Sequence, residues 1–535
     1  MKKLPLGIQN FREIVEGGYV YADKTQFIYK LINGAKYYFL SRPRRFGKSL
    51  LLDTISEAFS GKKELFKGLW IYGSDYSFPR HPVVRLDMGR VSNETPEILK
   101  KSILSNLELI YSAEGFELKD TVAADAFARL IVMLNQKYGQ RVVVLVDEYD
   151  KQILDHITDI ETASANRQAV RGFYGILKSM DPYLRFTFIS GVTKFTKTSV
   201  FSGLNNLLDI TLKEEYANIC GIETGDLGRC FGEHIRELST HKNFRGYDDL
   251  SAEILKWYDG YSWDGDTRVL NPFSLLTFLM QERFSSYWYA SGTPGFLPEL
   301  IKNKPDSYTN IGSLEITEHM LDSADIGKLT LAPLLFQTGY LTVKEILTAI
   351  GTPVYVLEAP NLEVREAFNM NVLSAMTEND DVRTGQMRLS INRALQAGDL
   401  QRALEMLRGF FASIPYELHV DLEAYYHSIF YAFMSALGFD LDVEVSVAKG
   451  RVDAALELGD KVYVMEFKYV KCPPDASDVD KQRLFDKALD EAMAQIRDRG
   501  YGDKYQGSGK TIYEAAFAFL GRGDIEMRAC VLSVN

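Results

Sequence analysis

The segment Ser41–Ser49 carries the residue types that hold a phosphate group. It runs Ser-Arg-Pro-Arg-Arg-Phe-Gly-Lys-Ser, between a predicted strand at 36–40 and a predicted helix at 50–59. The glycine leaves room for phosphate oxygens, the lysine supplies an ammonium group for the β- and γ-phosphates, and the last serine supplies a hydroxyl for magnesium. Arg42 stands where the usual loop has its first glycine, which leaves the strength of phosphate binding open. The expected nucleotide contacts here are Arg44, Arg45, Phe46, Gly47, Lys48 and Ser49.

Acidic and polar residues follow two predicted strands further along the chain. The apolar run 142–146 predicts a strand buried on both faces, and it ends in Asp147 and Glu148. We expect Asp147 to hold magnesium through water and Glu148 to orient or deprotonate the attacking water; solvated carboxylates after a strand are the alternative. After the next strand, Thr193 lies where such a site senses the γ-phosphate, although an ordinary polar turn explains it equally well. Asp150 is interpreted as a surface or partner contact.

Two carboxylates are predicted to face each other across a hairpin near the carboxyl end. Gly459-Asp460 is a good two-residue turn between two strand-like runs. Counting outward from this turn places Asp453 directly opposite Glu466, with Cβ atoms about 5 Å apart. Opposed carboxylates repel each other, whereas magnesium prefers oxygen ligands and neutralises their charge. Lys468 projects from the same face, where it can hold the attacking water or stabilise the pentavalent phosphate.

The residues of these two patterns define the expected metal ligands and catalytic groups. Glu423 is either an additional ligand or a structural hydrogen-bond partner, and a structural ion pair is the alternative to the whole hairpin metal site. The expected ligands are Ser49 and Asp147 at the nucleotide site and Glu423, Asp453 and Glu466 at the hairpin, with Mg²⁺ as the ion and Mn²⁺ as an alternative at the hairpin. The expected catalytic residues are Glu148, Asp453, Glu466 and Lys468.

The elements around these residues predict an α/β protein of several domains. Apolar strands alternate with helical stretches over the first part of the chain, which favours a doubly wound parallel sheet. Helices broken by aromatic, glycine-rich turns follow, and the last hundred residues return to α/β order. The predicted domains are a nucleotide-binding α/β domain at 1–215, a helical lid with a small winged or hairpin element at 216–345, a helical connector at 346–420 and a second α/β domain at 421–535.

Composition limits the location and the partners. The chain has 535 residues and a net charge of −11, so any nucleic-acid contact must come from a local basic patch, for which we expect Lys468, Lys471, Lys481 and Arg483. Four cysteines without a CxxC pair give no zinc signature and suit a reducing cytoplasm. No apolar run approaches the roughly 20 residues of a membrane span, which predicts a cytoplasmic protein without a membrane partner.

Together, the motifs resemble a family of bacterial proteins that join an AAA-ATPase-like domain to a carboxy-terminal PD-(D/E)XK nuclease domain. In the second half, the resemblance lies in Asp453 with Glu466-Phe467-Lys468, although Val452 stands where the family name has proline. The resemblance to this family implies a P-loop ATPase sheet with a lid, a restriction-endonuclease-like second domain, and ATP with Mg²⁺ as cofactors. In the first half of the chain, the residues that carry the resemblance are 21–25, 41–49, 147–150, 191–195, 201–206 and 257–261.

The leading hypothesis is an ATP-binding and ATP-hydrolysing protein coupled to a metal-dependent phosphodiesterase, a nuclease that acts on DNA; DNA is favoured over RNA as the partner, and the choice between them stays open. The resemblance implies a role in defence or in mobile elements. The first alternative is an ATP-dependent sensor or signalling switch whose nuclease-like domain binds nucleic acid or a partner without cleaving. A nucleotide-binding interaction protein with neither activity is the third. Cleavage specificity, the triggering signal, a homo-oligomeric state, and ATP hydrolysis as opposed to binding alone stay open.

Overall fold

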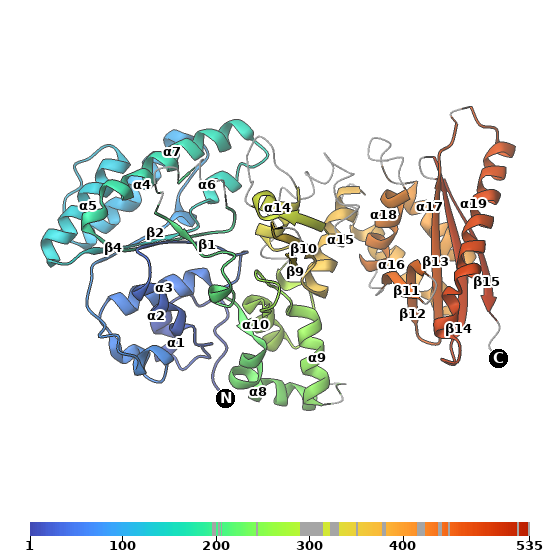
Figure 1. The fold of residues 1–535 in the computed structure, drawn as a ribbon, viewed down its shortest axis with the longest axis horizontal. Helices are drawn as coiled ribbons and strands as arrows, with labels where there is room; N and C mark the ends of the chain where they lie inside the picture. Colours follow the sequence, from blue (N-terminus) through green and yellow to red (C-terminus); the bar gives the residue numbers. More distant parts are fainter. Residues whose placement is uncertain are drawn as a thin grey trace. The chain divides into compact units, whose positions relative to one another are not determined.

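The chain forms two compact units in the computed structural model (Figure 1). The described residues up to Arg365 make the first unit, and those from Glu366 onward make the second. Among the helices formed by described residues, none combines the length and the apolar composition that a bilayer crossing requires. The structure describes residues 1–194, 200–201, 204, 206–241, 244, 246–288, 314–321, 331–348, 351–376, 381–412, 414, 423–436, 441–447, 450–473, 475–521 and 524–532.

A five-stranded parallel sheet forms the centre of the first unit, in the order β2-β3-β4-β1-β5. β3 is buried along its whole length, as its β-branched sequence predicts. The predicted doubly wound parallel sheet is therefore confirmed. Because all strands run the same way, their carboxyl ends meet at one edge, where Ser41 pairs with Gly191 and Asp87 pairs with Asp147. The strands are β1 (Tyr37–Ser41), β2 (Val83–Asp87), β3 (Val142–Asp147), β4 (Leu184–Gly191) and β5 (Leu208–Asp209).

Helices cover both faces of this sheet, with α1 to α3 on one side and α4 to α7 on the other (Figure 1). α5 shows why they pack there: it buries Phe127, Leu130, Ile131 and Leu134, which recur at three and four residue spacing on one helix face. The helices are α1 (Phe11–Glu16), α2 (Thr25–Asn33), α3 (Lys48–Phe59), α4 (Pro96–Ala113), α5 (Ala123–Tyr138), α6 (Lys151–Leu154) and α7 (Ile160–Ser179).

Helices and small antiparallel sheets make the rest of the first unit. The helices α8, α9 and α10 enclose an apolar core together with a two-stranded β6-β7 ladder. A three-stranded antiparallel sheet in the order β8-β10-β9 follows. The elements are β6 (Ile222–Glu223), α8 (Thr224–His241), α9 (Tyr247–Tyr258), β7 (Val269–Leu270), α10 (Pro272–Gln281), β8 (Leu314–Thr317), α13 (Glu318–Leu321), α14 (Leu331–Thr338), β9 (Thr342–Leu347) and β10 (Val354–Glu358).

The second unit is built on a five-stranded sheet in the order β11-β12-β13-β14-β15. Only β13 and β14 pair in parallel, since α19 connects them; the other neighbours are antiparallel. This is the second α/β domain that the sequence predicts. α15 (Leu362–Met376) begins in the first unit and continues into the second. The other elements of the second unit are α16 (Asp381–Ala397), α17 (Leu400–Phe411), α18 (Glu423–Ala436), β11 (Leu441–Val447), β12 (Gly450–Leu458), β13 (Lys461–Val470), α19 (Asp478–Arg499), β14 (Thr511–Leu520) and β15 (Asp524–Leu532).

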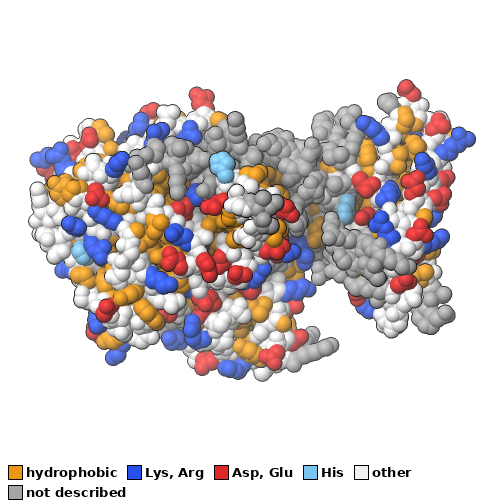
Figure 2. All heavy atoms as spheres, in the orientation of Figure 1, with side chains coloured by type: hydrophobic (Ala, Val, Ile, Leu, Met, Phe, Trp, Pro, Cys, Tyr) orange, Lys and Arg blue, Asp and Glu red, His pale blue; other side chains and the backbone are white. Residues whose placement is uncertain are grey.

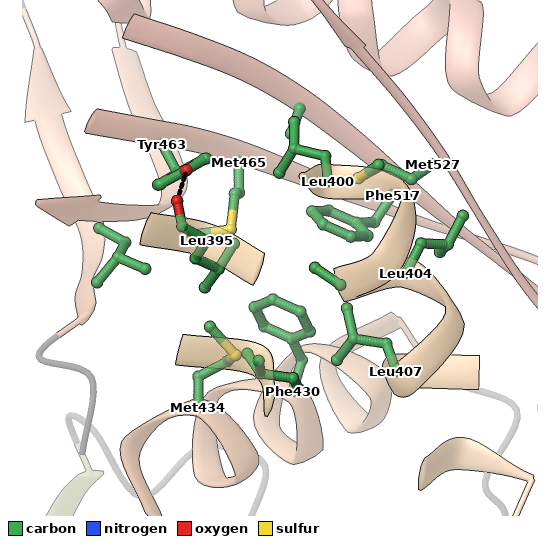
Figure 3. A pocket seen from close by; sticks show the side chains of 14 residues that line it. Leu395, Leu400, Leu404, Leu407, Phe430, Met434, Tyr463, Met465, Phe517 and Met527 are labelled. Atoms are coloured by element: carbon green, nitrogen blue, oxygen red, sulfur yellow. Dashed lines mark hydrogen bonds between the residues drawn. The ribbon is translucent and has the colours of Figure 1, made fainter. Parts of the chain in front are cut away.

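The two faces of this second sheet bury different helices. α19 packs on the face that carries Val462 and Val464. The opposite face, with Tyr463 and Met465, meets α16, α17 and α18 around a cavity of about 20 Å³ lined by apolar side chains (Figure 3). The Tyr463 hydroxyl donates to the Leu395 carbonyl there, which ties α16 to the sheet. Helices from the predicted connector thus supply part of the core beside the second sheet.

Candidate functional site

The turn between β1 and α3 presents backbone amides at the edge of the first sheet. Gly47 is the residue before α3 and has φ +86°, a left-handed conformation that suits glycine. Lys48 and Ser49 are the first residues of the helix, two positions earlier than the sequence predicts. The free amide groups of a helix N-terminus face the same side and favour an anion. The segment therefore has the local geometry of a phosphate loop.

The Lys48 ammonium group lies inside this loop. It donates to the carbonyl oxygens of Arg42 and Pro43, each at 2.8 Å, and is buried. Burial lowers the pKa of Lys48, and the nearby Asp147 carboxylate opposes that effect. Lys48 therefore lies between the loop carbonyls and the acidic end of β3.

Asp147 is the last residue of β3 and Glu148 follows it, and the two carboxylates lie in different environments. Asp147 is buried and accepts a hydrogen bond of 2.7 Å from the Ser190 hydroxyl at the end of β4. Glu148 has φ +52°, which is unusual for a residue with a side chain, and burial followed by the Asp147 charge raises its pKa. Gly89 leaves room for it, since a Cβ at position 89 would stand 2.4 Å from Glu148 Oε2. The turn after β2 thus lies against the carboxylate that the sequence assigns to water activation.

An open cavity of about 690 Å³ reaches these residues. Ser49, Asp147 and Glu148 line it together with the aminoterminal segment 7–10 and the end of β2. The structure therefore brings together the hydroxyl and the two carboxylates that the sequence places at one nucleotide site.

Thr193 and Asp150 form a buried pair. The Thr193 hydroxyl is fully buried and donates to Asp150 Oδ2 at 2.6 Å, and the Thr193 and Val192 amides donate to the same carboxylate. The interpretation of Asp150 as a surface contact is wrong, because its side chain is only 1% exposed. Burial raises the pKa of Asp150, while the bonds from Thr193 oppose this. The structure places the Thr193 hydroxyl on Asp150, and a nucleotide contact of Thr193 stays a prediction.

The hairpin in the second unit has the predicted register. Leu458 pairs with Lys461 across the Gly459-Asp460 turn, and the pairing continues without a shift to Ala454 and Met465. The next positions outward on that register are Asp453 and Glu466. The Asp453 carboxylate accepts a hydrogen bond of 2.9 Å from the Phe467 amide, which holds it against β13.

Glu466 is a carboxylate buried inside the sheet layer. Burial and then the Asp453 charge raise its pKa to about 7, while the charge of Lys468 lowers it. Its Oε1 accepts a hydrogen bond from the Gln495 amide and lies 3.7 Å from the Lys468 ammonium group. Its Oε2 is buried and has no hydrogen-bond partner among the residues described. An unsatisfied buried carboxylate oxygen is costly and therefore points to a missing ligand.

Glu423 is held by a backbone amide of β13 two residues beyond the Phe467 amide that holds Asp453. Its carboxylate accepts a hydrogen bond of 3.0 Å from the Tyr469 amide. α18, which carries Glu423, packs on the opposite face of the sheet, where Tyr426 stacks on Tyr469. In the described part of the chain, no three Asp, Glu, His or Cys side chains are grouped closely enough to hold a metal ion. The third-ligand role of Glu423 therefore stays a prediction, and the geometry supports the alternative of a structural hydrogen-bond partner.

The donor set of Asp453 and Glu466 fits a magnesium ion. Both side chains offer oxygen atoms on the sheet face toward α19, and the free Oε2 of Glu466 is available to a ligand. The Asp453 charge contributes to the raised pKa of Glu466, and a divalent cation bound between the two carboxylates would offset this repulsion. The two carboxylates thus fit the metal, although they supply only part of its coordination.

A basic residue that the sequence analysis did not single out interacts electrostatically with the hairpin carboxylates. Arg499 ends α19, and the charges of Glu466 and Asp453 contribute to raising its pKa after its hydrogen bond to the Tyr501 oxygen. It follows Gln495 by four residues, so both lie on one face of α19, and this spacing was a signal available in the sequence. Of the predicted basic patch, Lys481 pairs with Asp524 at 3.4 Å. Basic and acidic side chains are interspersed on the visible surface (Figure 2).

Comparisons with known proteins assign the first and the last part of the chain to families. Residues 5–201 match the AAA-ATPase-like family, described as a predicted AAA-ATPase, and residues 421–527 match the PD-(D/E)XK nuclease superfamily. A relative described as the uncharacterized protein in the vnfD 5′ region of Azotobacter chroococcum mcd 1 is 37% identical over 522 residues, covering 96% of this chain and 95% of that protein. The chain therefore belongs to this family of proteins with an AAA-ATPase-like domain and a PD-(D/E)XK nuclease domain, and the predicted resemblance is confirmed.

Two solved structures are similar to the chain at low identity. The Aeropyrum pernix ORC2 protein, in ADPNP and ADP complexes, has a TM-score of 0.27 and 11% identity, covering 68% of this chain and 98% of that one. Drosophila ORC bound to GC-rich DNA and Cdc6 has a TM-score of 0.23 and 10% identity, covering 80% of this chain and 62% of that one. Of the motifs quoted for the resemblance, Phe195, Ser202, Gly203 and Asn205 lie outside the described residues.

Proposed function

We propose that this protein binds and hydrolyses ATP at the edge of its parallel sheet and cleaves DNA, with a divalent metal, at the carboxylate hairpin. The observation that carries the nuclease half is the carboxylate pair of Asp453 and Glu466: the Asp453 charge helps to raise the Glu466 pKa, and the buried Oε2 atom of Glu466 lacks a partner among the described residues. A sheet selected for stability alone avoids such a pair, because each charge raises the cost of burying the other.

In the ATPase half, each side chain has a distinct task. Lys48 and the amides at the start of α3 bind the phosphates, while Ser49 and Asp147 are the oxygen donors for Mg²⁺. Glu148 deprotonates or orients the attacking water, and its raised pKa suits a group that takes up a proton. Asp150 and Ser190 hold the ends of β3 and β4 in place through their hydrogen bonds.

In the nuclease half, Asp453 and Glu466 hold Mg²⁺ or Mn²⁺. Such an ion, when bound, lowers the pKa of a water molecule and polarises the phosphate. Lys468 stabilises the negative charge that develops on the phosphate, from the same face as Glu466. Gln495 donates to Glu466 Oε1 and so fixes the direction in which the free Oε2 points.

The experiment combines the full-length protein with plasmid DNA, Mg²⁺ or Mn²⁺, and a chelator control, each with and without ATP. We expect nicking or linearisation that requires the metal and disappears with the chelator. A parallel assay with single-stranded RNA determines the substrate class. Intact plasmid under every condition, together with normal ATP hydrolysis, would reject the nuclease proposal and leave the ATPase proposal standing.

A second candidate is an ATP-dependent sensor whose nuclease-like domain binds nucleic acid or a partner without cleaving. One observation favours it: among the described residues the hairpin has two carboxylates and no third acidic, histidine or cysteine neighbour. DNA retention in a gel-shift assay without cleavage supports this candidate. The role in defence or in mobile elements that the resemblance implies stays a prediction.

A further inference from the structure

The five residues between Ser41 and Gly47 each contact the region 211–340 of the same unit. The Arg42 guanidinium is fully buried, 3.8 Å from the ring centre of Trp263. It donates to the carbonyl oxygens of Thr211 at 2.9 Å and Tyr216 at 3.1 Å. A planar guanidinium is suited to both contacts at once, because it stacks by its face and donates from its edge. Arg42 thus anchors the start of the loop.

The next two loop residues contact the residue after α14 and the segment after α10. Gly339 has φ +97°, and a Cβ there would lie 2.8 Å from the Pro43 ring, so only glycine allows this approach. The Trp288 indole donates to the Arg44 carbonyl at 3.4 Å. Both contacts act on the backbone path of the loop and leave its inner side to Lys48.

The last two loop residues meet aromatic rings. The Arg45 guanidinium lies 5.0 Å from the Phe273 ring centre. Phe46 is buried, with ring centres 4.6 Å from Tyr261 and 5.6 Å from Trp263, both edge to face.

These contacts bear on nucleotide binding through Lys48. The carbonyl oxygens that accept from its ammonium group belong to Arg42 and Pro43, the two residues held by Trp263 and Gly339. A usual phosphate loop takes its shape from glycine at the first position. Here the backbone at that position is instead fixed by the side chain of Arg42.

We propose that Arg42 and Trp263 are positioning residues that hold the phosphate loop, and Lys48 within it, in the shape that binds nucleotide. This rests on the proposed ATP site and goes beyond it, because it gives the atypical residue of the loop a purpose. It follows that restoring the usual glycine, in Arg42→Gly, weakens ATP binding. The opposite result is expected if Arg42 is merely a poor substitute for glycine.

The test measures ATP binding by calorimetry and ATP hydrolysis by steady-state kinetics in the full chain. For Arg42→Gly and Trp263→Leu we expect Kd and KM to rise about 10-fold or more, because each removes one side of a buried stacked pair. We expect kcat at saturating ATP to stay within about 3-fold, since Asp147 is the last residue of β3 and Glu148 follows it, so neither belongs to the loop. A merely destabilising change instead lowers the active fraction, and with it kcat, and leaves KM unchanged.

Conservative variants and a surface control complete the design. Trp263→Phe keeps a ring for the guanidinium and should restore most of the affinity, whereas Arg42→Lys keeps the charge without the planar fork and should restore less. Arg129→Ala removes an exposed guanidinium that pairs with Asp120, and this variant should bind as the wild type does. If Arg42→Gly does not fold, the ATP affinities of Trp263→Leu and Trp263→Phe are sufficient to test the proposal.

Three outcomes separate the two proposals. A wild-type protein that does not bind ATP overturns the proposed function. A wild type that binds, with loss of binding in Lys48→Ala, supports that function. If Arg42→Gly or Trp263→Leu then binds ATP as tightly as the wild type, the positioning inference is wrong while the ATP site stands.

Discussion

The phosphate loop and the carboxylate hairpin are both proposed to bind charged phosphate groups, and they are built in different ways. In the hairpin, Asp453 and Glu466 are neighbours because a two-residue turn fixes their register. In the loop, Lys48 is placed by carbonyl oxygens whose positions depend on residues more than 200 positions away, such as Trp263 and Gly339. A local turn thus builds one site, and long-range packing builds the other.

This difference explains which substitutions should act selectively. A change at the hairpin alters one pair of side chains inside a well-formed sheet, so its effect should stay in the second unit. A change around the loop acts through packing, so several distant residues should share an effect. The predictions below test that contrast, beginning with the largest expected effect.

Removing a hairpin carboxylate should abolish DNA cleavage and spare ATP hydrolysis. In Asp453→Ala one of two proposed metal donors is lost, and cleavage should fall to the level of a protein-free reaction. Plasmid cleavage and phosphate release are measured on the same preparation. Cleavage that survives Asp453→Ala at the wild-type rate would falsify the assignment of the metal site.

Replacing the carboxylate at the end of β3 should separate ATP binding from hydrolysis. Glu148→Gln keeps the shape and loses the base, so kcat should fall about 10²- to 10⁴-fold while Kd for ATP stays close to the wild-type value. Lys48→Ala is the matched variant and should lose binding itself. Full turnover in Glu148→Gln would assign water activation to another residue.

The amide that directs Glu466 should matter less than the carboxylates. Gln495→Ala removes the donor to Glu466 Oε1, and we expect cleavage to fall about 10- to 100-fold, as for other groups that orient metal ligands. Raising the metal concentration should recover part of the rate, because the loss is in metal affinity. An unchanged metal dependence in Gln495→Ala would contradict this role.

A methyl group at position 89 tests how far the turn after β2 sets the position of Glu148. In Gly89→Ala the new Cβ would meet the Glu148 carboxylate at 2.4 Å, so the carboxylate must shift. We expect kcat for ATP hydrolysis to fall about 10-fold with little change in Kd, because a displaced catalytic group slows the chemical step without removing a contact that binds ATP. The control Gly73→Ala has no heavy atom within 4 Å of the new Cβ and should hydrolyse ATP normally.

The smallest effect is expected at Glu423. Glu423→Gln keeps an oxygen that accepts from the Tyr469 amide, so cleavage should stay within about 3-fold of the wild type. The measurement is the cleavage rate across a range of metal concentrations. A loss as large as that of Asp453→Ala would restore Glu423 as a metal ligand.

The sequence predicted most of the fold near both sites, for reasons that are local. The β-branched run of β3 and the turn at Gly459-Asp460 depend on residues adjacent in the chain, so the strand and the hairpin register were both found. Asp150 was misjudged because its partners, Val192 and Thr193, follow the end of β4 about 40 residues away, and nothing in its own neighbourhood indicates that it is buried. The bond from the Tyr469 amide to Glu423 joins α18 to β13 across more than 40 residues, and the sequence alone gives no sign of it.

The sequence by itself determined the chemical groups and their order along the chain: the Gly-Lys-Ser turn, the acidic end of β3, and two carboxylates at matched distances from a turn. Periodicity and turn chemistry act over a few residues and leave a visible pattern. Only the tertiary structure decided that Arg42 packs on Trp263, that Gly89 adjoins Glu148, and that Glu466 keeps one oxygen unpaired among the described residues. Such contacts join segments far apart in the chain, and burial and charge are properties of the packed molecule rather than of any one segment.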